Sequence, residues 1–233
     1  MLDRSEPKSR ALQERLRREY PDVRLSRIPL DLEDPAAVAR AAAELTRRPP
    51  DVLILGAGAY SIPRHTCETG LDNVFQIDCA SPYCLVQALL PALRRQHTRV
   101  VAVGNIAHTY SHADAHDIDF SARRAASKVY GNAKRYLMFS LIERFSAERE
   151  TTLSVVHPGI TFTNITAHYP PLLFALIKWP MKVIFMSPRR AALSLLRGVF
   201  EPCNGCEWIG PWLFHVWGLP VRRPLHTCPP EER

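Results

Sequence analysis

A tyrosine and a lysine stand four positions apart in the segment YGNAK, at Tyr130 and Lys134. Side chains at this spacing share one face of an α-helix, so a helix would direct both into the same cleft. A nearby ammonium favours the ionised form of a phenol and lowers its pKa from about 10 toward neutral pH. The pair therefore predicts acid–base chemistry, provided that the chain around it forms a helix beside a pocket.

The chain on both sides of this pair alternates patterns that are typical of strands and helices. Apolar residues recur at helical spacing over residues 129–145, which places the pair on a helix. Nearly all-apolar segments at residues 51–55, 99–103 and 152–156 are typical of parallel strands that are buried on both faces. A further helix is expected from about residue 70 to residue 98. This order predicts a doubly wound parallel sheet of the α/β class.

The two ends of the chain carry other patterns. Residues 9–20 have apolar positions every four residues among charged ones, which predicts a surface helix. Residues 24–32 are interpreted as a strand, and residues 222–233 as a flexible tail. The sequence therefore predicts a single domain over residues 1–221.

The amino-acid composition indicates a protein of one globular domain. The 233 residues are 46% hydrophobic and 23% charged, which suits one domain with a continuous core. The net charge is +7, but the basic residues stand in scattered pairs, so we expect phosphate-bearing ligands and no nucleic acid. Six unevenly spaced cysteines and a charged N-terminal segment indicate free thiols, no signal peptide and a cytoplasmic location. No apolar run reaches the roughly 18–20 residues of a membrane-spanning helix.

Four landmarks make the sequence resemble the short-chain dehydrogenase/reductase (SDR) family over essentially its whole length. The family has a Rossmann-like fold, in which ligands bind beyond the carboxyl ends of the parallel strands. Three of the family's landmarks follow the third, fourth and fifth strands. The fourth landmark combines a catalytic helix with a Pro-Gly-x-Thr turn. Here they are LDLED (30–34), LILGAGAY (53–60), VVAVGNIAH (100–108), and YGNAK (130–134) with HPGITFT (157–163).

The resemblance implies a catalytic group around the Tyr130–Lys134 pair. Tyr130 would be the acid or base for the substrate oxygen, and Lys134 would hold the cofactor ribose and assist the phenol. Asn105 stands where the family has its catalytic serine, and its longer side chain can donate a hydrogen bond to a carbonyl oxygen. Asp78 stands where the family has an asparagine. A carboxylate cannot donate as an amide does, and we expect it to perturb Lys134.

The resemblance also implies a nicotinamide cofactor, and NADP is preferred to NAD because the Arg4–Ser5 pair resembles a 2′-phosphate site. Asp31 would approach the adenine ring, and Thr161 or Thr163 would hold the nicotinamide carboxamide. The segment after the fourth strand departs from the family, since it lacks two asparagines. The residues implied at the cofactor are Asp31, Gly56, Ala57, Gly58, Lys134, Pro158, Gly159, Thr161 and Thr163.

The family opens with a strand and a glycine-rich turn that cradles the cofactor pyrophosphate, and this chain has no glycine before Gly56. We therefore expect an N-terminally truncated Rossmann-like sheet. In the usual strand order, residues 24–32 would have no neighbouring strand and residues 51–55 would present an open edge. Two explanations are open. The sequence starts at an internal methionine of a longer protein, which we favour, or it is a natural remnant that completes its sheet by pairing with itself or with a partner.

The implied function is NAD(P)-dependent oxidoreduction, which interconverts a carbonyl and a secondary alcohol. The apolar residues 170–186, broken by prolines, have three interpretations: ordinary core, an interfacial membrane segment or a substrate lid. A lid suits their position best and implies a small hydrophobic alcohol or ketone as substrate. Since members of the family are usually dimers or tetramers, we expect a homo-oligomer. The alternative is a non-catalytic binding module whose apolar segment contacts a partner or, peripherally, a membrane.

Two further patterns could indicate metal or redox sites, but we prefer a simpler interpretation of each. Histidines and aspartates crowd one loop, but their spacing matches no tight ligand pattern, so we expect a solvated loop at the mouth of the site and no metal. A lone Cys-x-x-Cys, at Cys203 and Cys206, is interpreted as a turn with incidental thiols and not as a zinc or redox site. The crowded loop contains His108, His112, Asp114, His116, Asp117 and Asp119.

Overall fold

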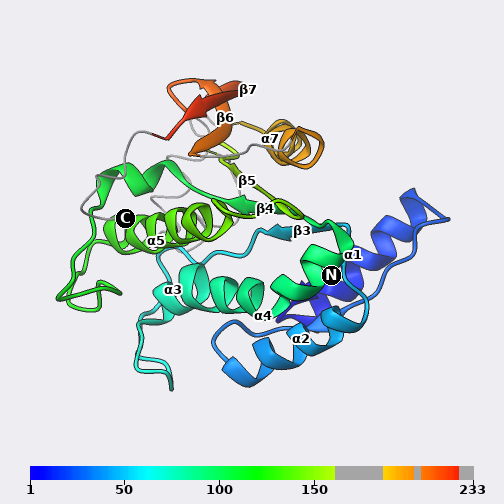
Figure 1. Ribbon diagram of the computed structural model, residues 1–233, viewed down its shortest axis with the longest axis horizontal. Coiled ribbons are helices and arrows are strands. Elements are labelled where there is room, and N and C mark those ends of the chain that lie inside the picture. The colour runs from blue at the N-terminus through cyan, green and yellow to red at the C-terminus, as the bar shows by residue number, and fades with distance from the viewer. Residues whose placement is uncertain (161–185, 202–205, 226–233) are drawn as a thin grey trace, which may run out of the picture.

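The computed structural model describes residues 1–160, 186–201 and 206–225, in which a central sheet lies between helices (Figure 1). The strands of this sheet are β3 (Val52–Leu55), β4 (Arg99–Val103), β5 (Thr152–Val156), β6 (Glu207–Leu213) and β7 (Trp217–Pro224), in that spatial order. The strands β3 to β6 are parallel, and β7 returns antiparallel beside β6. The predicted α/β class with a parallel, Rossmann-like sheet is therefore confirmed.

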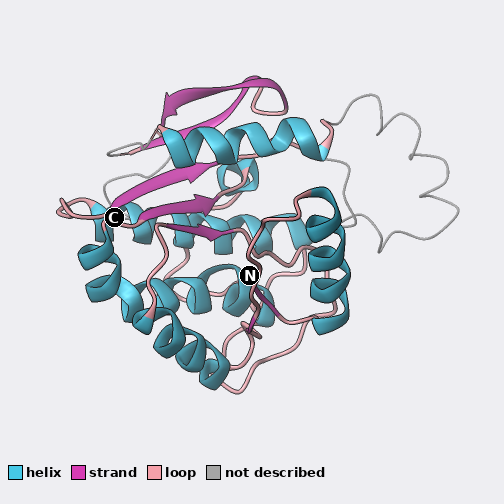
Figure 2. Ribbon diagram, turned by 90° about the vertical axis from the view of Figure 1, so that its right-hand side faces the viewer, coloured by secondary structure: helices cyan, strands magenta, loops and turns pink. Residues whose placement is uncertain are grey.

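Helices cover both faces of the sheet (Figures 1 and 2). They are α1 (Glu6–Glu19), α2 (Pro35–Arg47), α3 (Asn73–Phe75), α4 (Ser81–Gln96), α5 (Ala126–Phe145) and α7 (Pro188–Phe200), with a π-helical segment at Gln76–Ala80 and a 3₁₀ segment at Ile106–Tyr110. Val101 of β4 faces α7, where Leu195 packs against it. Its neighbour Val100 points to the opposite face and joins the main core with α2, α4 and α5. This alternation along a strand explains why the central strands are apolar throughout.

Several local patterns correspond to observed elements. The helical periodicity at residues 129–145 lies within α5, and the helix expected from about residue 70 corresponds to the run from α3 through α4. The N-terminal helix α1 begins at Glu6, three residues before the predicted start, with a proline in its first turn. These predictions are confirmed. They were possible because the apolar periodicity that predicts each helix lies within the segment itself.

The first residues of the chain form a small separate sheet. In it, β1 (Leu2–Asp3) pairs in parallel with β2 (Ile28–Pro29). The expectation that residues 24–32 form a strand without a neighbour is therefore wrong in two respects. First, strand β2 is only two residues long. Second, β2 has a neighbour, because the first residues of the chain lie beside it and the terminal ammonium of Met1 donates to Ser26 O at 2.8 Å.

The edge of β3 that faces this small sheet carries no strand among the described residues, so the predicted open edge is confirmed. Ile54 is 46% exposed there. A hollow lies between the two sheets, and apolar side chains line both of its walls. Leu2 and Leu30 come from one wall, and Leu53 and Leu55 from the other. The fold therefore has an apolar gap where its two sheets face each other.

The last third of the described chain contains regular elements that the sequence did not predict. Helix α7 and the β6–β7 hairpin follow residues 161–185, which lie outside the described residues and include most of the predicted lid at residues 170–186. Across the described parts of the chain, no helix combines the length and the apolarity that a membrane span requires.

The predicted start of the flexible tail is wrong. Strand β7 continues through Arg222, and Leu225 is buried, with its N–H donating to Cys206 O at 2.8 Å. Cross-strand pairing with β6 orders this segment, and such pairing is not visible in a charged local sequence. Cys203 and residues 226–233 lie outside the described residues.

Leu89 of α4 is fully buried in the main core, which makes it a test of the helix-on-sheet packing. We expect Leu89→Ala to lower the free energy of unfolding by about 2–5 kcal/mol, because it removes buried methyl groups and leaves a cavity. Leu196→Ala is the control, since Leu196 of α7 is 50% exposed and its loss should cost less than about 0.5 kcal/mol. Urea unfolding measures both values, and equal losses would contradict the packing.

Candidate active site

The tyrosine–lysine pair lies in the first half of α5, as its spacing predicted. Tyr130 is 8% exposed and Lys134 is 2% exposed, so both side chains are turned into the protein. The Lys134 Nζ atom lies 5.6 Å from the centroid of the Tyr130 ring. The helix therefore brings the phenol and the ammonium together in a buried environment.

A buried ion pair links Lys134 to Asp78. Asp78 belongs to the π-helical segment before α4, and its Oδ1 atom lies 3.0 Å from Lys134 Nζ. Both side chains are almost completely buried. The remaining groups are satisfied by the chain after β3, because Ala59 N donates to Asp78 Oδ2 at 2.9 Å and Lys134 Nζ donates to Ala57 O at 3.1 Å. Buried charges persist in this form, paired and hydrogen-bonded.

The ion pair keeps Lys134 charged. Burial acts to lower the pKa of the Lys134 ammonium, but the Asp78 carboxylate and the Tyr130 phenol outweigh burial, and the pKa is raised above its ordinary value. The substitution of a carboxylate for the family's asparagine therefore does perturb Lys134, by holding its charge in place.

The phenol of Tyr130 behaves differently from the sequence-based expectation. Burial raises its pKa above the ordinary value of 10.0, and the Lys134 ammonium and the Asn105 side chain lower the pKa only in part. The charge of Asp78 acts in the same direction as burial. The expected lowering toward neutral pH is wrong for this arrangement, because burial outweighs the effect of the ammonium and the Asp78 carboxylate adds to burial. Tyr130 is therefore protonated at neutral pH.

Asn105 lies at the start of the 3₁₀ segment that follows β4. Its Oδ1 atom accepts a hydrogen bond from Ala107 N at 2.9 Å, which caps this segment and orients the amide. The same side chain lies near enough to Tyr130 to lower the pKa of the phenol. The structure therefore places Asn105 beside the phenol, at the position that the family resemblance implied for a hydrogen-bonding partner.

Two of the three glycines implied at the cofactor, Gly58 and Gly159, leave no room for a side chain. A Cβ atom on Gly58 would stand 2.9 Å from Asp78 Oδ1 and 3.5 Å from Lys134 Nζ, so a side chain there would press on the ion pair. Gly159 has a φ of +80°, and a Cβ would meet Met186 Cε at 2.6 Å. Gly56 is exposed and Pro158 is half-buried. Thr161 and Thr163 lie outside the described residues.

The residues implied at the adenine end gather around Glu33. Asp31 Oδ1 accepts a hydrogen bond from Glu33 N at 3.0 Å. Arg4 Nη1 lies 3.3 Å from Glu33 Oε1, and the Arg4 side chain is 67% exposed. Ser5 precedes α1 as its N-cap residue and makes no side-chain capping bond. The structure thus brings Arg4 and Asp31 to one surface region, apart from the buried pair on α5.

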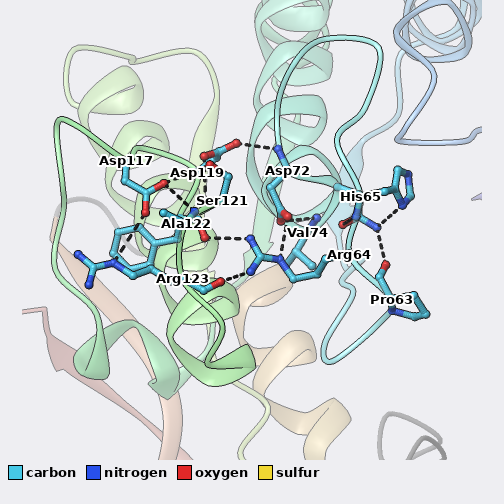
Figure 3. Close-up of polar contacts among 12 residues, drawn as sticks. Pro63, Arg64, His65, Asp72, Val74, Asp117, Asp119, Ser121, Ala122 and Arg123 are labelled. Carbon is cyan, nitrogen blue, oxygen red and sulfur yellow. Dashed lines mark hydrogen bonds and ion pairs between the residues drawn. The ribbon is translucent and has the colours of Figure 1, made fainter.

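The aspartates of the crowded loop bind arginine and backbone groups (Figure 3). Asp114 and Asp117 both pair with Arg123, whose guanidinium lies 3.1 Å from Asp114 Oδ2 and 3.7 Å from Asp117 Oδ2. Asp119 accepts from Asp72 N at 2.7 Å and from Ser121 N at 3.1 Å. The prediction of a solvated loop holds only in part, because His112 and His116 are exposed whereas His108 and Asp119 are buried.

One grouping of potential metal ligands among the described residues was not singled out from the sequence. It consists of Glu33, His65 and Cys67, whose ligand atoms lie within 4.8 Å of one another. His65 Nε2 lies 2.8 Å from Glu33 Oε2, and Asn73 Nδ2 lies 3.1 Å from His65 Nδ1. An amide NH₂ at Nδ1 favours the tautomer with its proton on Nε2, and the carboxylate accepts that proton. This arrangement is a hydrogen-bond chain, because a metal at Nε2 would need the other tautomer.

Sequence reasoning also missed the aromatic neighbours of the site. The ring of Tyr60 stands edge-on against Tyr130, with centroids 5.4 Å apart. His157, directly after β5, stacks on Trp208 of β6 with ring centroids 5.3 Å apart. Both residues occur in quoted motifs, LILGAGAY and HPGITFT, but only the folded chain shows what their rings contact.

Comparison with known families agrees with this site. The family model of the short chain dehydrogenases matches residues 1–171. The protein therefore belongs to the short-chain dehydrogenase family, a family of oxidoreductases, and the resemblance drawn from the landmarks is confirmed.

Curated relatives match with low identity. Retinol dehydrogenase 14 of Mus musculus is 30% identical over 175 residues, which are 70% of this chain and 51% of that protein. An uncharacterized oxidoreductase of Schizosaccharomyces pombe is 25% identical over 220 residues, or 87% of this chain and 64% of that protein. The chain spans about half the length of most of the curated relatives it matches.

Solved structures show the same fold. An uncharacterized protein from Mycobacterium Paratuberculosis superposes with a TM-score of 0.66 at 22% identity, covering 96% of this chain and 74% of that one. A short-chain dehydrogenase from Sphingobium yanoikuyae, in complex with NADPH, gives a TM-score of 0.61 at 20% identity, covering 84% and 72%. At these identities the likeness supports the fold alone.

The buried ion pair can be tested with a double-mutant cycle. We expect Asp78→Asn and Lys134→Met each to lower the free energy of unfolding by about 3–5 kcal/mol, because each leaves a buried group without its charged partner. The double variant should lose clearly less than the sum of the two single losses. Urea unfolding at neutral pH gives all four values, and strict additivity would show that the two charges do not interact.

His157 should make stability depend on pH. Burial lowers the pKa of its imidazole from 6.5 to about 4, so the neutral form belongs to the folded state. The stabilisation is complete above pH 6.5 and is lost as the pH falls toward 4, because the unfolded chain takes up the proton first. We expect His157→Phe, which keeps a ring against Trp208, to reduce the loss of stability between pH 7 and pH 5. His112→Gln, at an exposed position, is the control. An unchanged pH dependence in His157→Phe would refute this role.

Proposed function

We propose that the protein is an NAD(P)-dependent oxidoreductase that interconverts a carbonyl and a secondary alcohol. One observation carries this proposal. Tyr130, Asn105 and the Asp78–Lys134 pair converge beyond the carboxyl ends of β3 and β4. In open α/β sheets, ligands bind at this side of the strands.

Each side chain has a defined task in the proposed reaction. Tyr130, protonated at neutral pH, donates its proton to the oxygen of a carbonyl substrate, and it takes the proton back in the direction of oxidation. Asn105 lies beside the phenol, and its amide would donate a hydrogen bond to the same substrate oxygen. Lys134 supplies the fixed positive charge beside the phenol.

The residues of this chain fit one end of a nicotinamide cofactor. Lys134 donates to Ala57 O and forms an ion pair with Asp78, and because an ammonium has three N–H donors it would still offer one to a ribose hydroxyl. When bound, the cofactor would supply or accept the hydride. The chain has no glycine before Gly56, so it offers no glycine-rich turn for the pyrophosphate. The exposed Arg4 supports a preference for NADP over NAD.

The remaining parts of the proposal concern the substrate and the setting of the protein. A small hydrophobic alcohol or ketone is supported by the apolar residues 170–186 and by the retinol dehydrogenases among the relatives. The same apolar segment supports a proposal of peripheral membrane contact. A homo-oligomer is proposed because members of the family are usually dimers or tetramers. The free thiols of Cys67, Cys79 and Cys84 support a reducing compartment such as the cytoplasm.

Two measurements on the purified chain test the proposal. Titration with NADPH, and separately with NADH, should show saturable binding, and turnover of a hydrophobic ketone should fall by about 10²–10⁴-fold in Tyr130→Phe. Circular dichroism should show that Tyr130→Phe stays folded, since only the hydroxyl is removed. An absence of cofactor binding at millimolar concentration would overturn the proposal for this chain. Binding without any turnover in the parent protein would favour a non-catalytic module.

A further inference from the structure

A short stretch of chain passes over Tyr130. Residues 57–64, here called the strap, follow β3 and begin at the buried ion pair. Lys134 Nζ donates to Ala57 O at 3.1 Å, and Ala59 N donates to Asp78 Oδ2 at 2.9 Å. The start of the strap is therefore bound to the two charged residues that lie beside the phenol.

The middle of the strap covers the phenol itself. The Tyr60 ring stands edge-on against the Tyr130 ring, at 5.4 Å between centroids and 83° between planes. Tyr60 and Ile62 both pack on the small apolar cluster to which Tyr130 belongs. Tyr130 is 8% exposed, and Tyr60 and Ile62 of the strap are among the side chains that bury it.

Arg64 clamps the far end of the strap (Figure 3). Its Nε atom lies 2.8 Å from Asp72 Oδ2, and the Asp72 side chain is 5% exposed. The same guanidinium donates to Phe120 O at 2.9 Å and to Arg123 O. One planar fork thus joins the strap to the N-cap of α3 and to the loop before α5.

The backbone between these anchors is strained. Ser61 has a φ of +55°, a left-handed conformation that a residue with a Cβ adopts at a cost. Neighbouring contacts must hold such a residue in place, and here they are the Tyr60 packing on one side and the Arg64 clamp on the other.

We infer that Arg64 is a positioning residue, which holds the strap closed and thereby keeps Tyr130 covered. The chemical role of Tyr130 rests on the proposed function, whereas its burial under the strap does not. Opening of the strap at Arg64 is then the step that admits a substrate to the phenol.

Acetylation of Tyr130 by N-acetylimidazole, followed by peptide mass spectrometry, measures access to the phenol without any cofactor or substrate. We expect slow acetylation in the parent protein and an increase of at least tenfold in Arg64→Ala. Asp72→Asn should have a similar effect, because asparagine still caps α3 but carries no charge for Arg64. Arg64→Lys should be intermediate, since lysine can pair with Asp72 but cannot bind both carbonyl groups in a fixed fork.

Two controls separate release of the strap from general loss of stability. Arg40→Ala removes an arginine whose side chain is 70% exposed, and Leu89→Ala destabilises the core away from the strap. Neither should accelerate acetylation of Tyr130 under native conditions. Rapid acetylation in the parent, an unchanged rate in a folded Arg64→Ala, or an equal increase in both controls would each overturn the inference. Increased access without turnover in any variant would support the positioning role and count only against the oxidoreductase proposal.

Discussion

Two opposite charges that are withdrawn from water must pair with each other and find further hydrogen-bond partners, or the fold loses several kcal/mol for each ion. Asp78 and Lys134 meet this constraint at 3.0 Å. Because the same two side chains also bind the backbone of Ala57 and Ala59, the pair ties together α5, the π-helical segment and the chain that leaves β3. The arrangement around Tyr130 depends on this junction.

The junction also sets the chemical state of the phenol. An unpaired ammonium beside Tyr130 would lower the pKa of the phenol, but here Asp78 compensates the charge while burial raises that pKa. In this site the protonated Tyr130 packs against the ring of Tyr60. The strap, residues 57–64, is held at its far end by the ion pair between Arg64 and Asp72. A closed, uncharged phenol suits proton donation more than proton abstraction.

Much of the fold followed from local pattern. The strands β3, β4 and β5 and the helix α5 were predicted because their apolar pattern is a property of each segment alone. The pairing of β1 with β2, and that of β6 with β7, was missed. Short or mixed-polarity strands acquire their structure from partners, and Arg222 in β7 is ordered by a strand whose own pattern gave no signal.

The sequence by itself determined the family, the helix that carries Tyr130 and Lys134, and the residue types at Asn105 and Asp78. These features could be predicted because motif spacing and apolar periodicity depend only on residue types and on their separation along the chain. Only the tertiary structure decided that Asp78 faces Lys134 in a dry environment, that the pKa of Tyr130 rises, and that Arg64 reaches across to the loop before α5. Burial, pairing and distance between remote segments arise from packing, and no local stretch of sequence contains them.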